Sequence, residues 1–180
     1  MHRLLFAAVF AVVIAAPHAP APTSAAPFAQ SAQFREIGDL IVGRWMFEQI
    51  LDVDYPGLGK KGDKLSGQSI CRYAADGAAI DCDDFGGPTS AKRLWVWDRV
   101  NKRLQMLAID SGGNWDQDYI VKQGSKLVGK SSGYLGDGKR VDSQWEVVSE
   151  NGGRTQRSNG TNIVNGVRSP WRSTATRVDR

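Results

Sequence analysis

The stretch KRLWVWDRVNKRLQMLAID, residues 92–110, decides the fold, because it holds two apolar runs around the turn residues Asn101 and Lys102. Short runs of Trp, Val, Leu and Ile on both sides of a tight turn predict an antiparallel hairpin. One face of this hairpin carries Trp95, Trp97, Leu104, Met106 and Ala108, and the other carries Leu94, Val96, Leu107 and Ile109. A hairpin with one wet side alternates apolar and polar residues, whereas here both faces are apolar. A barrel lumen on one side and a covered surface on the other explains the pattern, and so does burial under the N-terminal segment.

The same alternation of short apolar runs and turn residues continues along the chain. From Ser66 onward a turn signal follows roughly every eight to twelve residues, among them Ala75-Asp76-Gly77, Ser111-Gly112-Gly113 and Gly136-Asp137-Gly138. An open meander of this length leaves two exposed edges, and closure into a barrel removes both. The sequence therefore predicts an all-β fold, an antiparallel up-and-down meander closed into a barrel of about eight to ten strands. A short helix over residues 31–41 precedes the barrel, because Phe34, Ile37, Leu40 and Ile41 recur at helical spacing.

The first 29 residues have the features of an export signal. Arg3 supplies the positive charge, residues 4–16 are uninterruptedly apolar, and a stretch rich in Pro and Ala follows. An apolar run of this length is shorter than the ~20 residues that a membrane-spanning helix needs. We expect cleavage of residues 1–29, a single barrel domain over residues 30–180 without stable membrane insertion, and a periplasmic or secreted location. The alternative is an uncleaved N-terminal anchor.

The charge pattern and the histidine content exclude several functions. The net charge is +4, and the basic residues are scattered among acidic ones, which argues against a nucleic-acid partner. Both histidines, His2 and His18, lie in the predicted leader. A mature chain without histidine has no Ser-His-Asp triad and no imidazole ligands for zinc or haem. We therefore expect no cofactor, no metal site and no catalytic residue.

The two cysteines form a candidate pair. Cys71 and Cys82 lie symmetrically about Asp76-Gly77, so they face each other across a hairpin. A disulfide is the natural prediction for an exported protein. A two-residue turn would place them in a hydrogen-bonded pair with Cα atoms ~5.5 Å apart, and a longer turn changes that count. A redox or metal-binding thiol pair is the competing interpretation.

The aromatic residues of the strands provide the candidate ligand contacts. Six Trp are many for a chain of this size, and aromatic walls with a few polar groups suit a partly apolar organic ligand. The lumen candidates are Trp95, Trp97, Met106, Trp115, Tyr119, Ser143 and Trp145. This set places Trp115 and Tyr119 inward, with Asp116 and Asp118 on the opposite face. For each of these residues simple core packing is the alternative role. The segment 52–65, with Pro56-Gly57, predicts a long loop, either a functional lid or an exposed connection.

One motif resembles a known family. Gly43-Arg44-Trp45 is similar to the Gly-x-Trp signature that opens the first strand of lipocalins and their calycin relatives, where a short helix precedes it. The resemblance implies a lipocalin-like barrel closed at one end by Trp45, with an Arg of the last strand, Arg172 or Arg177, covering the indole. The motif between later strands and the long C-terminal helix of typical lipocalins are not visible here. The resemblance implies transport or sequestration of a ligand.

Three functions remain open at this stage. The first is an exported protein, monomeric or weakly dimeric, that binds a small, partly apolar molecule in the lumen. The second is an inhibitor or assembly factor of the cell envelope that docks through the hairpin 94–109. The third is an enzyme that uses Tyr119 or the carboxylates of Asp110, Asp116 and Asp118, since neighbouring carboxylates raise each other's pKa. Asp81, Asp83 and Asp84 are more consistent with a solvated acidic turn than with a Ca²⁺ site.

Overall fold

The computed structural model describes residues 31–178, so the predicted signal peptide over residues 1–29 lies outside the described residues. The elements are α1 (Ala32–Ile41), β1 (Gly43–Ile50), β2 (Lys64–Ala74), β3 (Ala79–Gly86), β4 (Thr89–Asp98), β5 (Arg103–Asp110), β6 (Trp115–Gln123), β7 (Lys126–Tyr134), β8 (Arg140–Glu150), β9 (Thr155–Val164) and β10 (Val167–Arg177). Two short 3₁₀ turns, Ala75–Gly77 and Asn151–Gly153, connect β2 to β3 and β8 to β9. Among the described residues, no helix has the length and apolar character that a membrane crossing requires.

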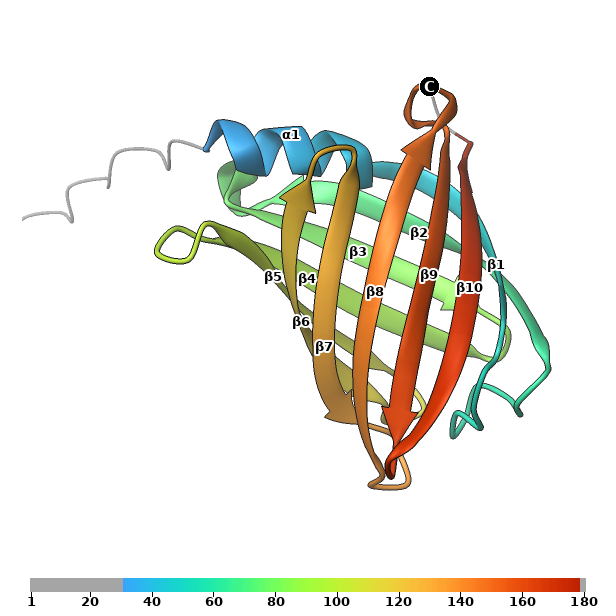
Figure 1. Ribbon diagram of the computed structural model, residues 1–180. Helices are drawn as coiled ribbons and strands as arrows, with labels where there is room; N and C mark the ends of the chain where they lie inside the picture. Colours follow the sequence, from blue (N-terminus) through green and yellow to red (C-terminus); the bar gives the residue numbers. More distant parts are fainter. Residues whose placement is uncertain (1–30, 179–180) are drawn as a thin grey trace, which may run out of the picture.

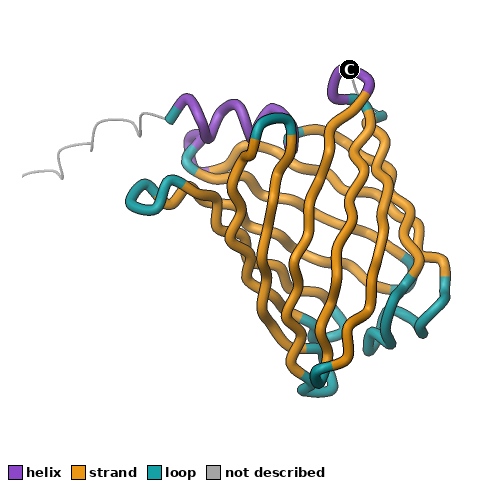
Figure 2. Tube along the Cα trace, viewed as in Figure 1, coloured by secondary structure: helices purple, strands orange, loops and turns teal. Residues whose placement is uncertain are grey.

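The ten strands form one closed antiparallel barrel. Each strand pairs with the next in sequence, and β1 pairs with β10 to close the sheet. Figures 1 and 2 show the strands running around the barrel, with the helix lying across one end. The prediction of an all-β meander with a short N-terminal helix is confirmed, with strand number at the upper bound of the expected range.

Helix α1 closes one end of the barrel. Ser31 caps it, since its Oγ accepts a hydrogen bond from the backbone N–H of Phe34. The apolar face of the helix, with Phe34, Ile37 and Ile41, is buried against the barrel interior. The ring of Phe34 is fully buried, and its centroid lies 6.5 Å from that of Trp97. Burial of this apolar face, more than helix propensity, therefore holds the short helix in place.

The segment 51–63 docks at the opposite end of the barrel. Leu51 and Asp52 are buried, and the Nδ2 of Asn162 on β9 donates to an Asp52 carboxylate oxygen at 3.0 Å. Further along the segment, the side-chain amide of Asn114 donates to the carbonyl of Pro56 at 3.1 Å. A Cβ added to Gly112 would lie 2.3 Å from that same carbonyl oxygen, so the approach of the loop requires glycine there. The segment therefore covers this end of the barrel through a few specific contacts, while residues 60–63 remain exposed.

A disulfide joins Cys71 on β2 to Cys82 on β3, which confirms the predicted pair. The two residues face each other directly, but the turn is longer than the two residues assumed from the sequence, because Ala74 pairs with Ala79. The Cα atoms are 4.1 Å apart, close to the ~4.5 Å of the narrow, non-hydrogen-bonded class of pairs. The expected wide pair is therefore wrong, and the longer turn is the reason.

Removing this disulfide will lower stability without changing the fold. The double variant Cys71→Ala/Cys82→Ala frees a loop of the denatured chain that the bond otherwise constrains, and we expect a loss of about 2–3 kcal/mol in the free energy of unfolding. Urea unfolding followed by tryptophan fluorescence measures it. An unfolding free energy equal to that of the oxidised wild type would contradict this expectation.

The β4–β5 hairpin has the two faces that the sequence predicts. Trp95, Leu104 and Met106 point inward and are buried, whereas Leu107 and Ile109 are 52% and 55% exposed on the outside. The outer apolar face is thus uncovered in the single chain, because α1 lies over the barrel end and not over this face (Figure 1). Docking of a partner on this face stays a prediction.

Candidate functional site

The barrel encloses a cavity of about 490 Å³. Every strand contributes to its wall, Ile41 of α1 lies at one end, and Leu51, Tyr55 and Leu58 of the loop lie at the other. A cavity of this size is within the range of small-molecule sites in proteins. The lumen is therefore hollow, which the sequence alone leaves undecided.

Five of the seven candidates from the sequence line this cavity, namely Trp95, Met106, Trp115, Ser143 and Trp145. Trp115 lies at the rim, where its ring stacks against Tyr134 with centroids 5.5 Å apart. Trp97 is absent from the lining, because it packs against Phe34 below the helix. Tyr119 lies on the outer face, where the guanidinium of Arg103 sits 4.0 Å from the ring centroid.

The orientation of β6 differs from the one expected. The sequence places the aromatic residues inward, but the structure turns Asp116, Asp118 and Ile120 into the barrel and leaves Tyr119 outside. The signal that reveals this orientation is Ile120, which is fully buried and shares a face with both aspartates. The inward face of β6 thus places two carboxyl groups inside the lumen, where partners from other strands must compensate their burial.

Glycines on β7 and β9 give two tryptophans room to lie along the wall. Gly129 faces Trp145 on β8, and a Cβ there would come within 2.3 Å of the indole. In the same way Gly160 faces Trp171 on β10, with a Cβ at 2.4 Å from its indole. Each indole lies over the backbone of the neighbouring strand, a close approach that only glycine allows. The large aromatic surface therefore lines the cavity without filling it.

A charged pair crosses the wall between β3 and β4. Arg93 donates from Nε and Nη2 to both carboxylate oxygens of Asp84, at 2.6 and 2.7 Å. The same Nη2 donates to the hydroxyl of Ser69 at 2.8 Å. A bidentate pair of this kind is strong and directional. It neutralises the charge of Arg93 within the lumen.

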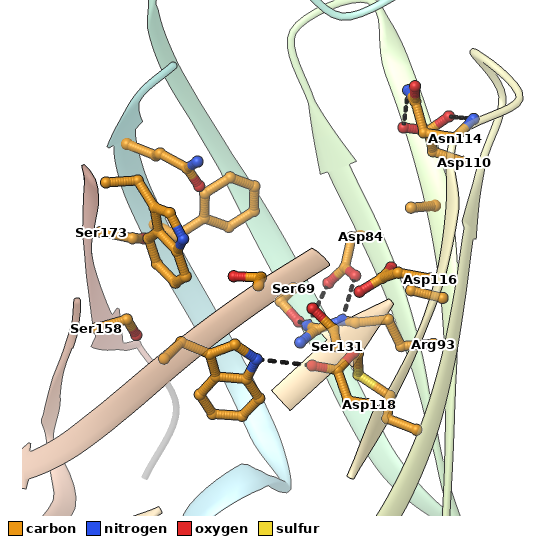
Figure 3. Close-up of a pocket in the computed structure, with 18 of the residues that line it drawn as sticks. Ser69, Asp84, Arg93, Asp110, Asn114, Asp116, Asp118, Ser131, Ser158 and Ser173 are labelled. Atoms are coloured by element: carbon orange, nitrogen blue, oxygen red, sulfur yellow. Dashed lines mark hydrogen bonds and ion pairs between the residues drawn. The ribbon is translucent and has the colours of Figure 1, made fainter. Parts of the chain in front are cut away.

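Two carboxyl groups of β6 lie beside this pair. Figure 3 shows Asp116 and Asp118 gathered with Asp84, Arg93 and Ser131 on one side of the cavity. The indole Nε1 of Trp145 donates to Oδ1 of Asp118 at 2.7 Å. Burial, reinforced by the charge of Asp116 beside it, raises the pKa of Asp118 to about 9, and burial also raises the pKa of Asp116. Asp118 therefore keeps its proton at neutral pH.

Several polar atoms of the lining have no hydrogen-bond partner among the described residues. They are Nε1 of Trp95, Oδ2 of Asp118, Oγ of Ser143 and Nε1 of Trp171. All four residues line the cavity. A buried polar group without a partner costs roughly 1–3 kcal/mol, so such groups call for a partner such as water or a ligand.

The barrel end near α1 has the arrangement that the Gly-x-Trp motif implies. Trp45 is buried after Gly43, and its Nε1 donates to the carbonyl of Ile41 at 2.9 Å. Of the two arginines proposed to cover it, Arg177 lies over the ring at 4.5 Å and also donates to the carbonyl of Asp39. Arg172 is exposed on β10. This cation–π contact ties the last strand to the first and to the helix.

The remaining acidic residues have structural partners. Asp110 caps its own turn, since its Oδ1 accepts from the backbone N–H of Gly112 and of Asn114. Asp81 and Asp83 form ion pairs with Lys92 on the outer surface. Within residues 31–178, no group of three or more metal-ligating side chains could hold a metal ion.

The raised pKa of Asp118 makes stability depend on pH. Its folded pKa of about 9 exceeds the unfolded value of about 3.9, so between these values the folded state binds more protons than the unfolded chain. The free energy of unfolding is highest on the acid side of this window and falls as pH rises through it, by up to about 1.4 kcal/mol per pH unit. Carboxyls with a lowered pKa, such as Asp98 at about 2, make the free energy of unfolding rise with pH. They do so only below about pH 4, outside most of the window that Asp118 controls.

We therefore expect Asp118→Asn to flatten the decline in stability between about pH 5 and about pH 8. Asparagine mimics the protonated acid, because its carbonyl still accepts from Trp145 and its amide still donates. Urea unfolding at three pH values in this window measures the slope. Asp142→Asn is the matched control, since Asp142 pairs with Arg140 on the surface and its pKa is lowered. A slope in Asp118→Asn equal to that of the control would contradict the assignment.

Neither a family model nor a curated protein matches this chain. The ten-stranded closed meander is compatible with a lipocalin-like barrel. The function proposed for the protein therefore rests on its cavity and not on similarity to a known protein.

Proposed function

We propose that this protein binds a small, partly apolar organic molecule in the barrel lumen, as a carrier or a sequestering protein. The observation that carries the proposal is a hollow lumen of about 490 Å³ whose aromatic wall also presents buried polar atoms without partners. A barrel of about eight strands is just wide enough to be filled by side chains or to hold one small ligand, and ten strands give a wider interior. Here small residues such as Ala108, Ser158 and Ser173 face the cavity and leave it open.

The two ends of the barrel support the same function. Helix α1 and the Trp45–Arg177 contact close one end, whereas hydrogen bonds and glycine contacts hold the loop 51–63 on the other. A cover made by one loop is the element that local opening affects most readily, since few buried apolar contacts hold it. We place ligand entry at the loop end.

A titration with the neutral, polarity-sensitive dye prodan tests the proposal. We expect saturable binding of one dye per chain, with a blue shift of the emission, because the aromatic lumen excludes bulk water. Emission that rises linearly with dye concentration, or that stays at its value in water, would contradict a ligand-binding lumen.

An exported location is part of the proposal. The Cys71–Cys82 disulfide supports it, because such bonds persist in oxidising compartments. Fractionation of the producing cell, with the mass of the purified chain, tests both the location and the removal of residues 1–29. We further propose a monomer or a weak homodimer, which sedimentation of the purified protein tests.

The carboxyl pair favours acid–base catalysis as a second candidate. Asp118 keeps its proton at neutral pH, as a general acid requires, and Asp116 lies beside it as the candidate general base. The two functions differ in the fate of the ligand. A carrier returns its ligand chemically unchanged after prolonged incubation, whereas an enzyme converts it, and Asp116→Asn would then stop the conversion.

A further inference from the structure

Acidic side chains outnumber basic side chains in the lining of the lumen. Among residues 31–178, Arg93 is the only basic side chain that lines the cavity, and it faces Asp84, Asp110, Asp116 and Asp118. Arg93 is already neutralised by the bidentate pair with Asp84, and the Asp110 carboxylate is held by its own turn. The carboxyls of Asp116 and Asp118 therefore face the cavity without a salt bridge to any described residue.

One oxygen of this pair is unpartnered inside the cavity wall. Asp118 is only 1% exposed, and its Oδ1 is bound by Trp145, but its Oδ2 has no hydrogen-bond partner in the described part of the chain. The hydroxyl of Ser143, directly across from Ser131 on the neighbouring strand, is likewise unpartnered. Carboxyl and hydroxyl oxygens thus gather at this side of the lumen, which is the side that Figure 3 shows.

From this imbalance we infer that the ligand carries an amine on an apolar, aromatic-sized body, with the ammonium group between Asp116 and Asp118. The inference rests on the proposed ligand-binding function and names the ligand class of the same cavity. An ammonium group has three donors and one positive charge, which suit two carboxyl groups that no basic side chain pairs with. Trp45, Trp95 and Trp171 line the rest of the cavity and supply apolar contacts for the body of the ligand.

The inference predicts that amine binding releases a proton, which can be measured. Without ligand, Asp118 holds a proton and is hydrogen-bonded to Asp116; when an ammonium takes the place of this proton, that hydrogen bond is lost and the proton leaves to the solvent. The groups that act on the pair are Arg93 with its partner Asp84, Asp110 at the end of β5, and Tyr55 of the loop, whose pKa burial raises so that it stays neutral. Arg93 favours ionisation of both carboxyls, and the hydrogen bond from Trp145 favours ionisation of Asp118, but burial opposes ionisation more strongly. Amine affinity should therefore rise with pH, by up to about tenfold per pH unit, until the proton is lost in the free protein at about pH 9.

Three probes with one skeleton test the inference: 4-phenylbutylamine, 4-phenylbutan-1-ol and 4-phenylbutyric acid. Calorimetric titration at about pH 7.5, in two buffers of different ionisation enthalpy, gives the affinity and the number of protons released. We expect the amine to bind at least about tenfold more tightly than the alcohol, with release of up to about one proton, and the acid to bind most weakly.

The variant Asp116→Asn/Asp118→Asn should lose the preference for the amine over the alcohol. Asp142→Asn, on the outer surface, should keep that preference. Should the double variant fail to fold, the rise of amine affinity with pH in the wild type, against a flat profile for the alcohol, tests the same inference.

Equal affinity for amine and alcohol would overturn the inference and leave the ligand-binding function intact. The tightest binding by the acid would also overturn it, since Arg93 would then be the anchor. If the amine, the alcohol and prodan all fail to bind, both the inference about the ligand class and the proposed ligand-binding function are wrong.

Discussion

Ser173→Trp will abolish ligand binding without unfolding the barrel. Ser173 lies on β10, lines the cavity, and appears with Ser158 on the other side of the view from the carboxyl pair in Figure 3. An indole at this position occupies the space that the ligand needs, in a wall where the native residue is small. We expect prodan affinity to fall by about 100-fold or more, because the added indole takes volume that the dye needs between the cavity walls.

The neighbouring residue provides the control. Arg172 is exposed on the outer face of the same strand, so Arg172→Trp adds the same side chain outside the barrel. Wild-type affinity is expected in this variant. Similar losses in both variants would show that binding depends on the surface or on strand stability and not on the lumen, against the proposal.

Phe34→Ala will produce the largest loss of stability. The ring is fully buried beneath α1 and contacts Tyr73 and Trp97, with centroids at 6.3 and 6.5 Å. Removing a buried phenylalanine costs about 3–5 kcal/mol through lost transfer free energy and the cavity left behind. Because this ring anchors the helix on the barrel end, we also expect faster amide exchange in α1 than in the strands.

Urea unfolding measures the first effect, and hydrogen exchange followed by mass spectrometry measures the second. Gln33→Ala, at an exposed neighbouring position of the same helix, is the control and should change the free energy of unfolding by less than about 0.5 kcal/mol. A loss in Phe34→Ala below about 1 kcal/mol would mean that the helix is not part of the core.

The sequence contains enough information for the fold because local signals agree over its length. The turn residues recur between short β-rich runs, and the faces of residues 94–109 separate as predicted into a buried and an exposed set. The Cys71–Cys82 symmetry survives the error in turn length, because a longer turn about the same centre preserves which residues face each other. The docked loop at 51–63 depends on contacts between Pro56, Gly112 and Asn114, far apart in sequence, and has no local signal.

The sequence analysis did not place the carboxyl groups of Asp116 and Asp118 in the lumen, and the reason is physical. Aromatic residues on a strand are expected inward, yet Tyr119 lies outside under Arg103, and Asp118 takes the interior position. The interior tolerates that carboxyl because Trp145, 27 residues further along the chain on β8, donates a hydrogen bond to it and because the acid keeps its proton. Such compensation between β6 and β8, which lie on either side of β7, is not visible in the residue pattern of a single strand. Trp97 is the opposite case, because the sequence analysis expected it in the lumen but it packs against Phe34 of α1.

The methionines provide the most direct test of the central claim that the lumen binds a ligand. Of the three in the sequence, Met106 is buried in the cavity wall, Met46 is 46% exposed on the outside, and Met1 falls within the predicted leader. In a protein with ¹³C-labelled methionine methyl groups, addition of 4-phenylbutan-1-ol should shift the Met106 signal saturably and produce a nuclear Overhauser contact with the phenyl ring. The Met46 signal should remain in place, with Met106→Leu used for assignment. A shift of Met46 without Met106, or no shift of either at saturating probe, would contradict a ligand-binding lumen.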